Sequence, residues 1–341
     1  MLPENLKSSG MRIAILIAAI LCVGGIFSAC NKADRKSVGS QEKVTIAYST
    51  SPDAALAQVA QARGYYLQEG LEAIPQKYPY GKVALDALLE GKADFATVAE
   101  TPVMFAIMRG EKVSIVATIQ TSGRNVAIIA RKDKGILAPH NLKGRTIAVT
   151  SGTLLDFYVD AFLVTHGLAK KDMTLVNMPP DKMAEALQRG DVNAVAAWSH
   201  VLIQTQKRLG DKGITFYDED IYTQTFNIVT TWDYVRTHPE NVKKALRALI
   251  NAEKFVDQKP SDAQAIVAEF CGMDKDVIAG MWPVENFKVT LDQSLLFALE
   301  DETRWAIKGG LTSKKTTPNY LNFIYVDGMD SVKPNAVRIL R

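Results

Sequence analysis

The chain has 341 residues, of which 47% are hydrophobic and 23% are charged, and its formal net charge is +3. This length and composition are typical of a globular protein of about two domains, and they exclude a collagen-like or low-complexity chain. The nearly balanced charge argues against a nucleic-acid-binding protein, which usually carries a concentrated basic face.

Residues 1–30 have the three parts of a secretory signal peptide. Basic residues, Lys7 and Arg12, precede an apolar run over residues 13–29, and small residues stand at the end of that run. A leader of this kind places the folded part of the protein outside the cytoplasm. Met11 would begin a shorter signal of the same type.

The end of the leader, Phe27-Ser28-Ala29-Cys30, resembles the lipobox of bacterial lipoproteins. That resemblance implies cleavage before Cys30, which would then carry the lipid anchor. An uncleaved membrane anchor and ordinary signal cleavage remain as alternatives. Residues 31–42 are polar and unable to bury apolar area, so we expect a flexible tether there.

Beyond the tether, short apolar runs alternate with helical patterns. The first half of the pattern predicts strands at 44–49, 95–98, 113–119 and 126–130, and helices at 53–67, 83–89 and 102–108. The second half predicts strands at 146–150, 174–178 and 192–198, and helices at 154–165 and 183–188. Strands that alternate with helices indicate βα units, a mostly parallel sheet and an α/β fold.

The same order of elements occurs twice, which suggests two lobes. Residues 87–98 and 186–197 both run from a helix end through Gly and a polar residue into a buried strand. The last third is helical, with helices expected at 242–256, 262–271, 276–281 and 291–307. We therefore expect lobe 1 over 43–127 plus 231–341 and lobe 2 over 128–230. Two connections between lobes leave a cleft, a common place for a small-molecule site.

No enzyme or metal motif is found. The chain lacks the glycine-rich nucleotide loops, the metalloprotease helix and the nucleophile elbow. Its four His residues have no metal-ligand spacing, and Cys271 is the single cysteine after Cys30. We predict no catalytic residues, no metal and no cofactor.

Polar loops follow several predicted strands, where open α/β sheets collect ligands. The most informative is Thr150-Ser151-Gly152-Thr153, which opens a helix. Its backbone N–H groups suit an anion, but an ordinary N-cap by Ser151 or Thr153 explains the residues equally well. Four further loops, at 49–53, 78–81, 99–102 and 121–125, and Trp198 at a strand end, are similarly placed.

The chain resembles the periplasmic substrate-binding proteins of ABC transporters, in the nitrate/sulfonate/taurine group. The matching stretches are Gly91-Lys-Ala-Asp-Phe with Pro102, residues 142–153, residues 186–194 with Trp198, and a tail with Pro239, Leu291-Asp292 and Pro318-Asn-Tyr. The resemblance implies a type II periplasmic-binding-protein-like fold, in which two α/β lobes close over a ligand and a helical C-terminal part packs on them.

Carried over by position, the resemblance also implies a set of ligand contacts. These are Ser49, Ser51, Tyr80, Glu100, Ser122, Asn125, Ser151, Gly152, Thr153, Trp198 and Asn227. Two departures matter: many relatives have Trp-Glu-Pro where this chain has Trp198-Ser199-His200, and Glu100 stands where a small residue is frequent. A carboxylate there would repel a bare anion and suit an amine or hydroxyls.

Arg124 joins the expected ligand contacts because its guanidinium suits Glu100 or a carboxylate or sulfonate of the ligand. The alternative for Glu100 is a surface charge near a helix start. The ligand expected from these residues is a small polar organic anion or zwitterion.

The function that the resemblance implies is that of a monomeric solute-binding lipoprotein of an ABC importer. It would capture its ligand in the interlobe cleft at the periplasm or cell surface and deliver it to a membrane permease. One alternative is an enzyme of thiamine-pyrimidine biosynthesis on the same fold, whose cysteine-rich signature this chain lacks. A ligand-sensing module is the other.

Overall fold

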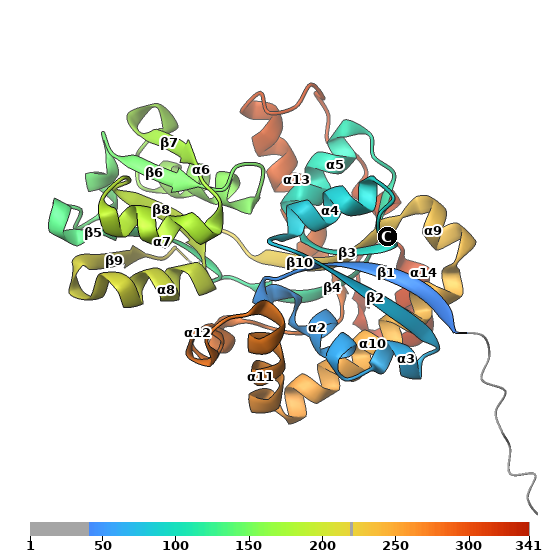
Figure 1. Ribbon diagram of the computed structural model, residues 1–341. Helices are drawn as coiled ribbons and strands as arrows, with labels where there is room; N and C mark the ends of the chain where they lie inside the picture. The colour runs from blue at the N-terminus through green and yellow to red at the C-terminus, as the bar shows by residue number, and fades with distance from the viewer. Residues whose placement is uncertain (1–40, 219–220, 341) are drawn as a thin grey trace, which may run out of the picture. The chain divides into compact units, whose positions relative to one another are not determined.

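Two five-stranded sheets organise residues 41–218 and 221–340, which the computed structural model describes (Figure 1). The first sheet has the order β2 (Leu71–Tyr78), β1 (Glu42–Ser49), β3 (Phe95–Ala99), β10 (Gln224–Thr231) and β4 (Val113–Ser122). The second has the order β7 (Thr174–Asn177), β6 (Thr146–Val149), β8 (Ala194–Trp198), β5 (Val126–Arg131) and β9 (Gly213–Phe216). Both belong to one compact unit that begins at Glu42.

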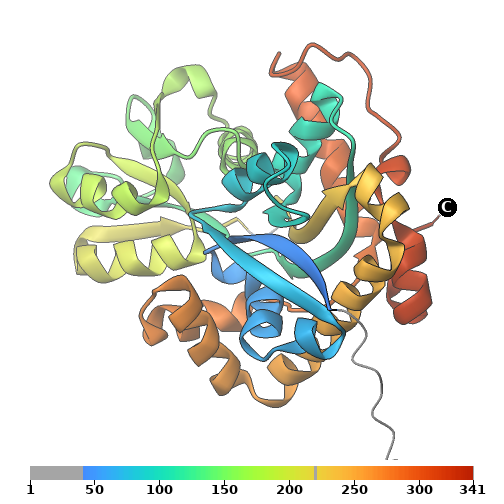
Figure 2. The ribbon, with the colours of Figure 1, turned by 45° about the vertical axis from the view of Figure 1, so that its right-hand side comes forward.

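Helices cover both faces of each sheet, as the two ribbon views show (Figures 1 and 2). One face of the first sheet carries α2 (Ala55–Ala62), α3 (Tyr65–Gln68), α10 (Pro239–Gln258) and α14 (Val326–Val332), and the other carries α4 (Gly81–Leu89), α5 (Glu100–Arg109) and α13 (Gln293–Lys308). The second sheet packs α6 (Leu154–Thr165) on one face and α7 (Pro180–Arg189) with α8 (Ser199–Leu209) on the other. The remaining helices are α9 (Trp232–Thr237), α11 (Pro260–Cys271) and α12 (Lys275–Met281), and β11 (Leu291–Asp292) pairs with β12 (Val337–Arg338).

Burial explains which strands the sequence revealed. Strands β3 and β8 lie inside the sheets and are buried at every position, so their apolar runs are continuous. Strand β2 was not predicted, because as an edge strand it alternates buried and exposed residues and contains Pro75. Proline lacks the N–H that a central strand must donate, and an edge strand tolerates it. The sequence pattern also missed α8 and β9.

Each sheet contains one strand that runs against its neighbours. Strand β10 pairs antiparallel with β3 and β4, and β5 pairs antiparallel with β8 and β9. The sheets are therefore mixed, and the other four strands of each run in the same direction, as the expectation of mostly parallel sheets requires. These pairings also put the two connections between the sheets at residues 123–125 and 217–223. The predicted limits of lobe 2, residues 128 and 230, fall inside β5 and β10, so residues 224–230 belong to the first sheet instead.

The C-terminal helices contact both lobes, as expected for this part of the chain. Helix α10 packs on α2 in the first lobe, and α12 packs on α8 in the second. On α13, the Trp305 indole Nε1 donates to Asp160 Oδ2 of α6 at 2.8 Å. The Trp305 ring also meets Phe157 of α6 edge to face, with centroids 5.6 Å apart.

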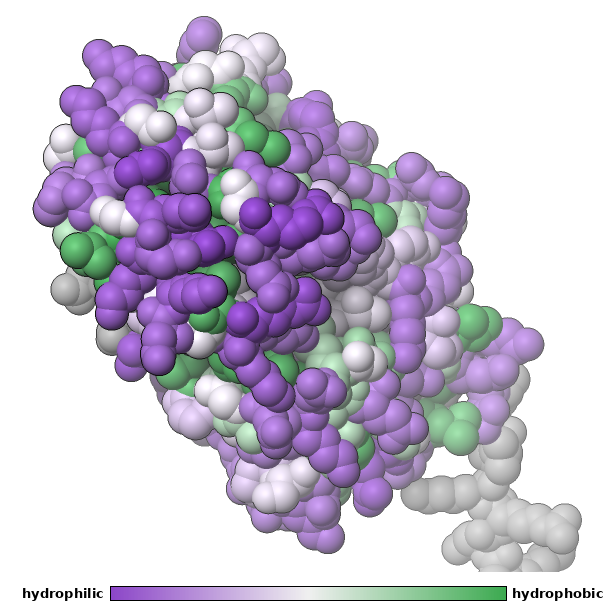
Figure 3. Space-filling model, turned by 60° about the vertical axis from the view of Figure 1, so that its left-hand side comes forward, coloured by the Kyte–Doolittle hydropathy of each residue, from purple (hydrophilic) through white to green (hydrophobic). Residues whose placement is uncertain are grey.

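The face of the molecule in Figure 3 is mostly hydrophilic, with small separate hydrophobic areas. Over residues 41–218 and 221–340, no helix has both the length and the apolar character needed to cross a bilayer. The predicted signal peptide of residues 1–30, the lipidation site Cys30 and all but the end of the predicted tether lie outside the described residues.

Candidate functional site

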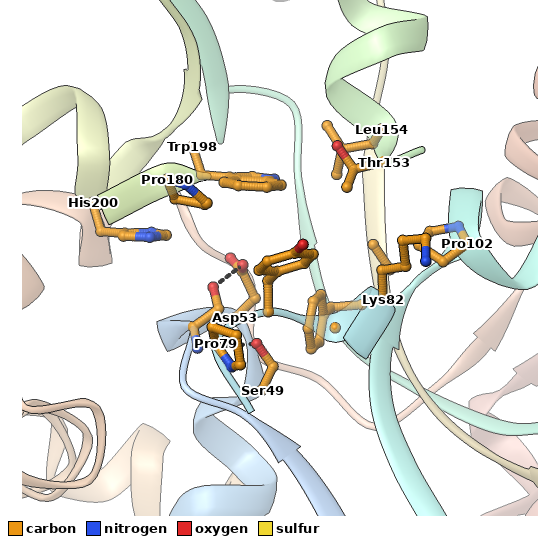
Figure 4. Close-up of a pocket in the computed structure, with 15 residues that line it drawn as sticks. Ser49, Asp53, Pro79, Lys82, Pro102, Thr153, Leu154, Pro180, Trp198 and His200 are labelled. Carbon is orange, nitrogen blue, oxygen red and sulfur yellow. Dashed lines mark hydrogen bonds between the residues drawn. The ribbon is translucent and has the colours of Figure 1, made fainter. Parts of the chain in front are cut away.

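A pocket lies between the two sheets and takes its walls from both lobes (Figure 4). It encloses about 440 Å³ of empty space, part of it open to solvent. The lining residues are Ser49, Ser51, Asp53, Pro79, Tyr80, Gly81, Lys82, Ala99, Pro102 and Phe226 from the first lobe, and Thr153, Leu154, Pro180, Trp198 and His200 from the second.

The turn between β1 and α2 forms the floor of the pocket. The Ser51 N–H donates to Ser49 Oγ at 3.0 Å, and Gln58 Nε2 donates to the Ser51 carbonyl at 2.8 Å. Pro52 starts the helical turn that leads into α2, and it places Asp53 there. The Ser51 hydroxyl donates to Asp53 Oδ2. These bonds fix three polar side chains in one orientation.

The start of α4 forms a second wall and depends on a glycine. A Cβ on Gly81 would lie 2.9 Å from the Val98 Cα atom, so no larger residue fits without moving the backbone. Glycine thus lets α4 begin directly against β3 and presents Tyr80 and Lys82 to the pocket. The Lys82 ammonium is 2.9 Å from the Asp86 carboxylate one turn later on the same helix.

The second lobe contributes a stacked pair of rings. Trp198 ends β8 and His200 lies in the first turn of α8, with ring planes 2° apart and centroids separated by 6.3 Å. Burial lowers the pKa of His200 to about 4, since the charged imidazolium is poorly solvated there. At neutral pH His200 is therefore uncharged.

The loop at residues 150–153 forms a helix cap, and its backbone N–H groups are engaged within the protein. The Thr153 side chain accepts from the Leu155 N–H at 3.3 Å, which confirms the N-cap interpretation. The Ser151 N–H donates to Asn177 Oδ1, and the Gly152 N–H donates to the Asp156 carboxylate. At the Gly152 N–H, a side-chain carboxylate of the protein thus takes the place that an anion would occupy.

Asn125 joins the lobes beneath the pocket. Its Nδ2 donates to Asp53 Oδ1 at 2.8 Å. On the other side, the Ser199 N–H donates to the Asn125 carbonyl at 2.7 Å and the Ser199 hydroxyl donates to Asn125 Oδ1 at 2.9 Å. Asn125 lies in the first connection between the sheets, so it ties the pocket floor to the start of α8.

Five of the predicted ligand contacts line this pocket: Ser49, Ser51, Tyr80, Thr153 and Trp198. The other seven do not. In the first lobe, the Ser122 hydroxyl donates to the Val284 carbonyl, and Glu100 and Asn227 are buried. In the connection between the sheets, Arg124 lies over the Tyr217 ring and Asn125 bridges the lobes. In the second lobe, Ser151 is exposed and Gly152 lines a neighbouring pocket. Ligand contact by the five residues in the pocket stays a prediction.

Ten lining residues were not named individually as ligand contacts. Five of them, Asp53, Pro79, Gly81, Ala99 and Pro102, lie in the predicted polar loops at 49–53, 78–81 and 99–102. The other five, Lys82, Leu154, Pro180, His200 and Phe226, lie outside these loops. Extending the predicted loop at 78–81 by one residue, into the first turn of its helix, would have found Lys82.

Glu100 is part of a buried carboxyl pair rather than a ligand contact or a surface charge. Its Oε2 accepts from the Thr225 N–H at 2.8 Å and from the Thr225 hydroxyl at 2.9 Å. Glu302 of α13 accepts from the Thr101 hydroxyl, and both carboxyl groups are fully buried. Burial raises the pKa of Glu100 to about 7, and burial together with the Glu100 charge raises the pKa of Glu302 well above its usual range. The two groups therefore share at least one proton at neutral pH.

Metal binding was not predicted from the sequence. Over the described parts of the chain, no group of three or more His, Cys, Asp or Glu side chains is arranged to hold an ion.

Comparisons with known proteins agree with this architecture. The family model described as NMT1/THI5 like matches residues 51–263. The taurine-binding periplasmic protein of Escherichia coli (strain K12) is 24% identical over 216 residues, which cover 62% of this chain and 65% of that protein.

Two solved structures show the same fold. The periplasmic aliphatic sulphonate binding protein SsuA from Escherichia coli aligns with a TM-score of 0.71 and 18% identity, over 81% of this chain and 95% of that one. The periplasmic nitrate-binding protein NrtA from Synechocystis PCC 6803 aligns with a TM-score of 0.70 and 16% identity, over 86% and 88%. The predicted two-lobed periplasmic-binding-protein fold is thus confirmed.

The buried carboxyl pair predicts a pH-dependent stability. The folded protein holds a proton that the unfolded chain releases, so the free energy of unfolding falls as pH rises from about 4.5 to about 7. Glu302→Gln places an uncharged amide beside Glu100 and should raise the free energy of unfolding at pH 8 by about 1–3 kcal/mol, with little change at pH 4.5. Urea denaturation across this pH range measures the effect.

The matched control is Glu300→Gln, an exposed carboxylate on the same helix that pairs with Arg304. It should change stability by less than about 0.5 kcal/mol at either pH. Equal pH dependence in the Glu302→Gln variant and the unaltered protein would contradict the shared proton.

Proposed function

The chain belongs to the NMT1/THI5-like family, and on that premise we propose that it captures a small solute between its two lobes and delivers it to the permease of an ABC importer. The observation that carries the proposal is the pocket itself, which takes lining residues from both lobes. A solute that touches both lobes favours their closed arrangement, because the closed form offers it more contacts. In this proposal, the closed, solute-bound form is the one that the permease recognises.

The names of the relatives support a small polar solute. They specify taurine, aliphatic sulphonates and nitrate as ligands of those proteins. We propose for this chain the ligand class expected from its sequence, a small polar organic anion or zwitterion. Its contacts are proposed to be the hydroxyls of Ser49, Ser51, Tyr80 and Thr153 and the ring of Trp198.

Binding without catalysis is part of the proposal. The relatives named above are binding proteins, which favours a transport role over the enzyme of thiamine-pyrimidine biosynthesis and over a ligand-sensing module. The family is also named after biosynthetic members, so a turnover assay with the identified solute distinguishes transport from catalysis.

Anchoring at the outer side of a bacterial membrane completes the proposed function. The periplasmic relatives support an extracytoplasmic site of action. The lipobox-like end of the leader supports lipidation at Cys30. We propose that the protein acts as a monomer. Cys30→Ser should then move the protein from the membrane fraction to the soluble fraction of bacterial cells, and unchanged membrane attachment would contradict the lipid anchor.

A thermal-shift screen tests solute binding. The panel contains alkanesulfonates, taurine, nitrate, amino acids, dicarboxylates and polyamines. A solute at 100 times its Kd should stabilise the protein by about 2.7 kcal/mol, which raises Tm by a few degrees. Ser51→Ala and Trp198→Ala should each reduce the shift, because both side chains line the pocket.

Ser151→Ala is the matched control, since Ser151 is exposed and lies outside the pocket lining. It should leave the shift unchanged. A shift that survives both pocket variants but is lost in Ser151→Ala would place the site at the 150–153 loop instead.

A further inference from the structure

The pocket contains a buried carboxylate whose protein partners are all uncharged. Asp53 is 2% exposed and lines the pocket. Its carboxyl group receives hydrogen bonds from the Ser51 hydroxyl and the Asn125 amide, and Gln224 contributes a third. Burial raises the pKa of Asp53, and the three donors partly oppose that rise because each of them favours the ionised carboxylate over the acid. None of these partners supplies a positive charge.

The basic side chains of the lining do not neutralise Asp53. Among the fifteen lining residues these are Lys82 and His200. The Lys82 ammonium is held by Asp86 at 2.9 Å, and His200 is uncharged because burial lowers its pKa to about 4. Negative charge in a buried site is stable when a cation or a full set of donors meets it.

A second carboxyl group lies near the first. Glu285 accepts a hydrogen bond from Gln120, and its Oε1 is buried without a partner. Burial and the charge of Asp53 raise the pKa of Glu285 well above its usual range, and burial raises the pKa of Asp53 as well. The Gln224 side-chain oxygen is likewise buried without a partner. Neither Glu285 nor Gln224 lines the pocket, so Asp53 is the acidic side chain of this cluster that reaches it.

Aromatic rings form much of the remaining wall. Tyr80 and Phe226 come from the first lobe and Trp198 from the second. Figure 4 shows the Trp198 ring and Asp53 on opposite sides of the pocket. Aromatic faces attract cations, most strongly the face of Trp, and a cation between such rings and a carboxylate gains from both.

We propose that the solute bears a positively charged nitrogen, which lies between Asp53 and the ring of Trp198. This inference rests on the proposed function and narrows its ligand class: a zwitterion with an ammonium end or an organic cation fits the pocket, and a simple anion does not. The ammonium supplies the charge that Asp53 lacks and leaves the hydroxyls of Ser49 and Tyr80 for the rest of the solute.

Isothermal titration calorimetry on the purified full chain tests the charge directly. The probes are pairs with the same carbon skeleton, propylamine with propane-1-sulfonate and benzylamine with phenylmethanesulfonate. We expect the amine of at least one pair to bind about tenfold or more tightly than its sulfonate. Asp53→Asn keeps the size of the side chain, and it should weaken amine binding at least about tenfold.

Two further variants make the result specific. Trp198→Leu should also weaken amine binding, since it removes the aromatic face, and it keeps the test open if Asp53→Asn does not fold. Asp233→Asn, whose carboxylate is exposed and pairs with Arg236, is the matched control and should bind amines as the unaltered chain does.

The outcomes separate this inference from the proposed function. Tighter binding of the sulfonate in a pair, or amine binding that Asp53→Asn leaves unchanged, overturns the inference while solute capture stands. No heat from either member of both pairs, together with a silent thermal-shift panel, overturns the proposed function and the inference with it.

Discussion

The hydrogen bonds of Asn125 are the constraint on which the site depends. They connect the Asp53 carboxylate, in the turn between β1 and α2, to Ser199 at the start of α8, across the first connection between the sheets. The turn after β1, the first connection between the sheets and the start of α8 therefore meet at one point. Buried polar groups in such a network fix a single arrangement only when each finds its partner. The pocket lies directly on this junction, so a change in the angle between the lobes changes the shape of the pocket floor.

The charge that the pocket presents to a solute depends on which of its polar groups already bind acidic side chains of the protein. Two features that would serve an anion are occupied: the Gly152 N–H by Asp156 and the Lys82 ammonium by Asp86. His200 is uncharged and stacked beside Trp198. What remains open to a solute is a carboxylate, hydroxyls and aromatic rings. The chain shares its fold with sulfonate- and nitrate-binding proteins, and the charge of its own pocket depends on its side chains and not on that fold.

The sequence predicted the buried elements well and the surface elements poorly. Strands β3 and β8 and helix α6 are apolar enough to be recognised locally, and the helical C-terminal part was correctly expected to pack on or between the lobes. The edge strand β2 was missed because half of its residues face solvent. Some predicted site residues, such as Ser51 in a loop and Trp198 at a strand end, line the pocket. Glu100 instead lies buried beside Glu302, on a helix about 200 residues later in the chain. A pairing over that distance leaves no local pattern, and neither does the approach of Asp53 to Asn125, which are 72 residues apart.

Identification of a solute that the protein carries from the cell tests the central claim most directly. The chain would be purified from its own host without unfolding, its intact mass measured under native conditions, and the released compound identified by mass spectrometry after denaturation. A compound with a basic nitrogen, bound in one copy and absent from the Asp53→Asn variant, is the predicted result. A sulfonate or nitrate without any basic nitrogen, retained equally by that variant, would contradict the account.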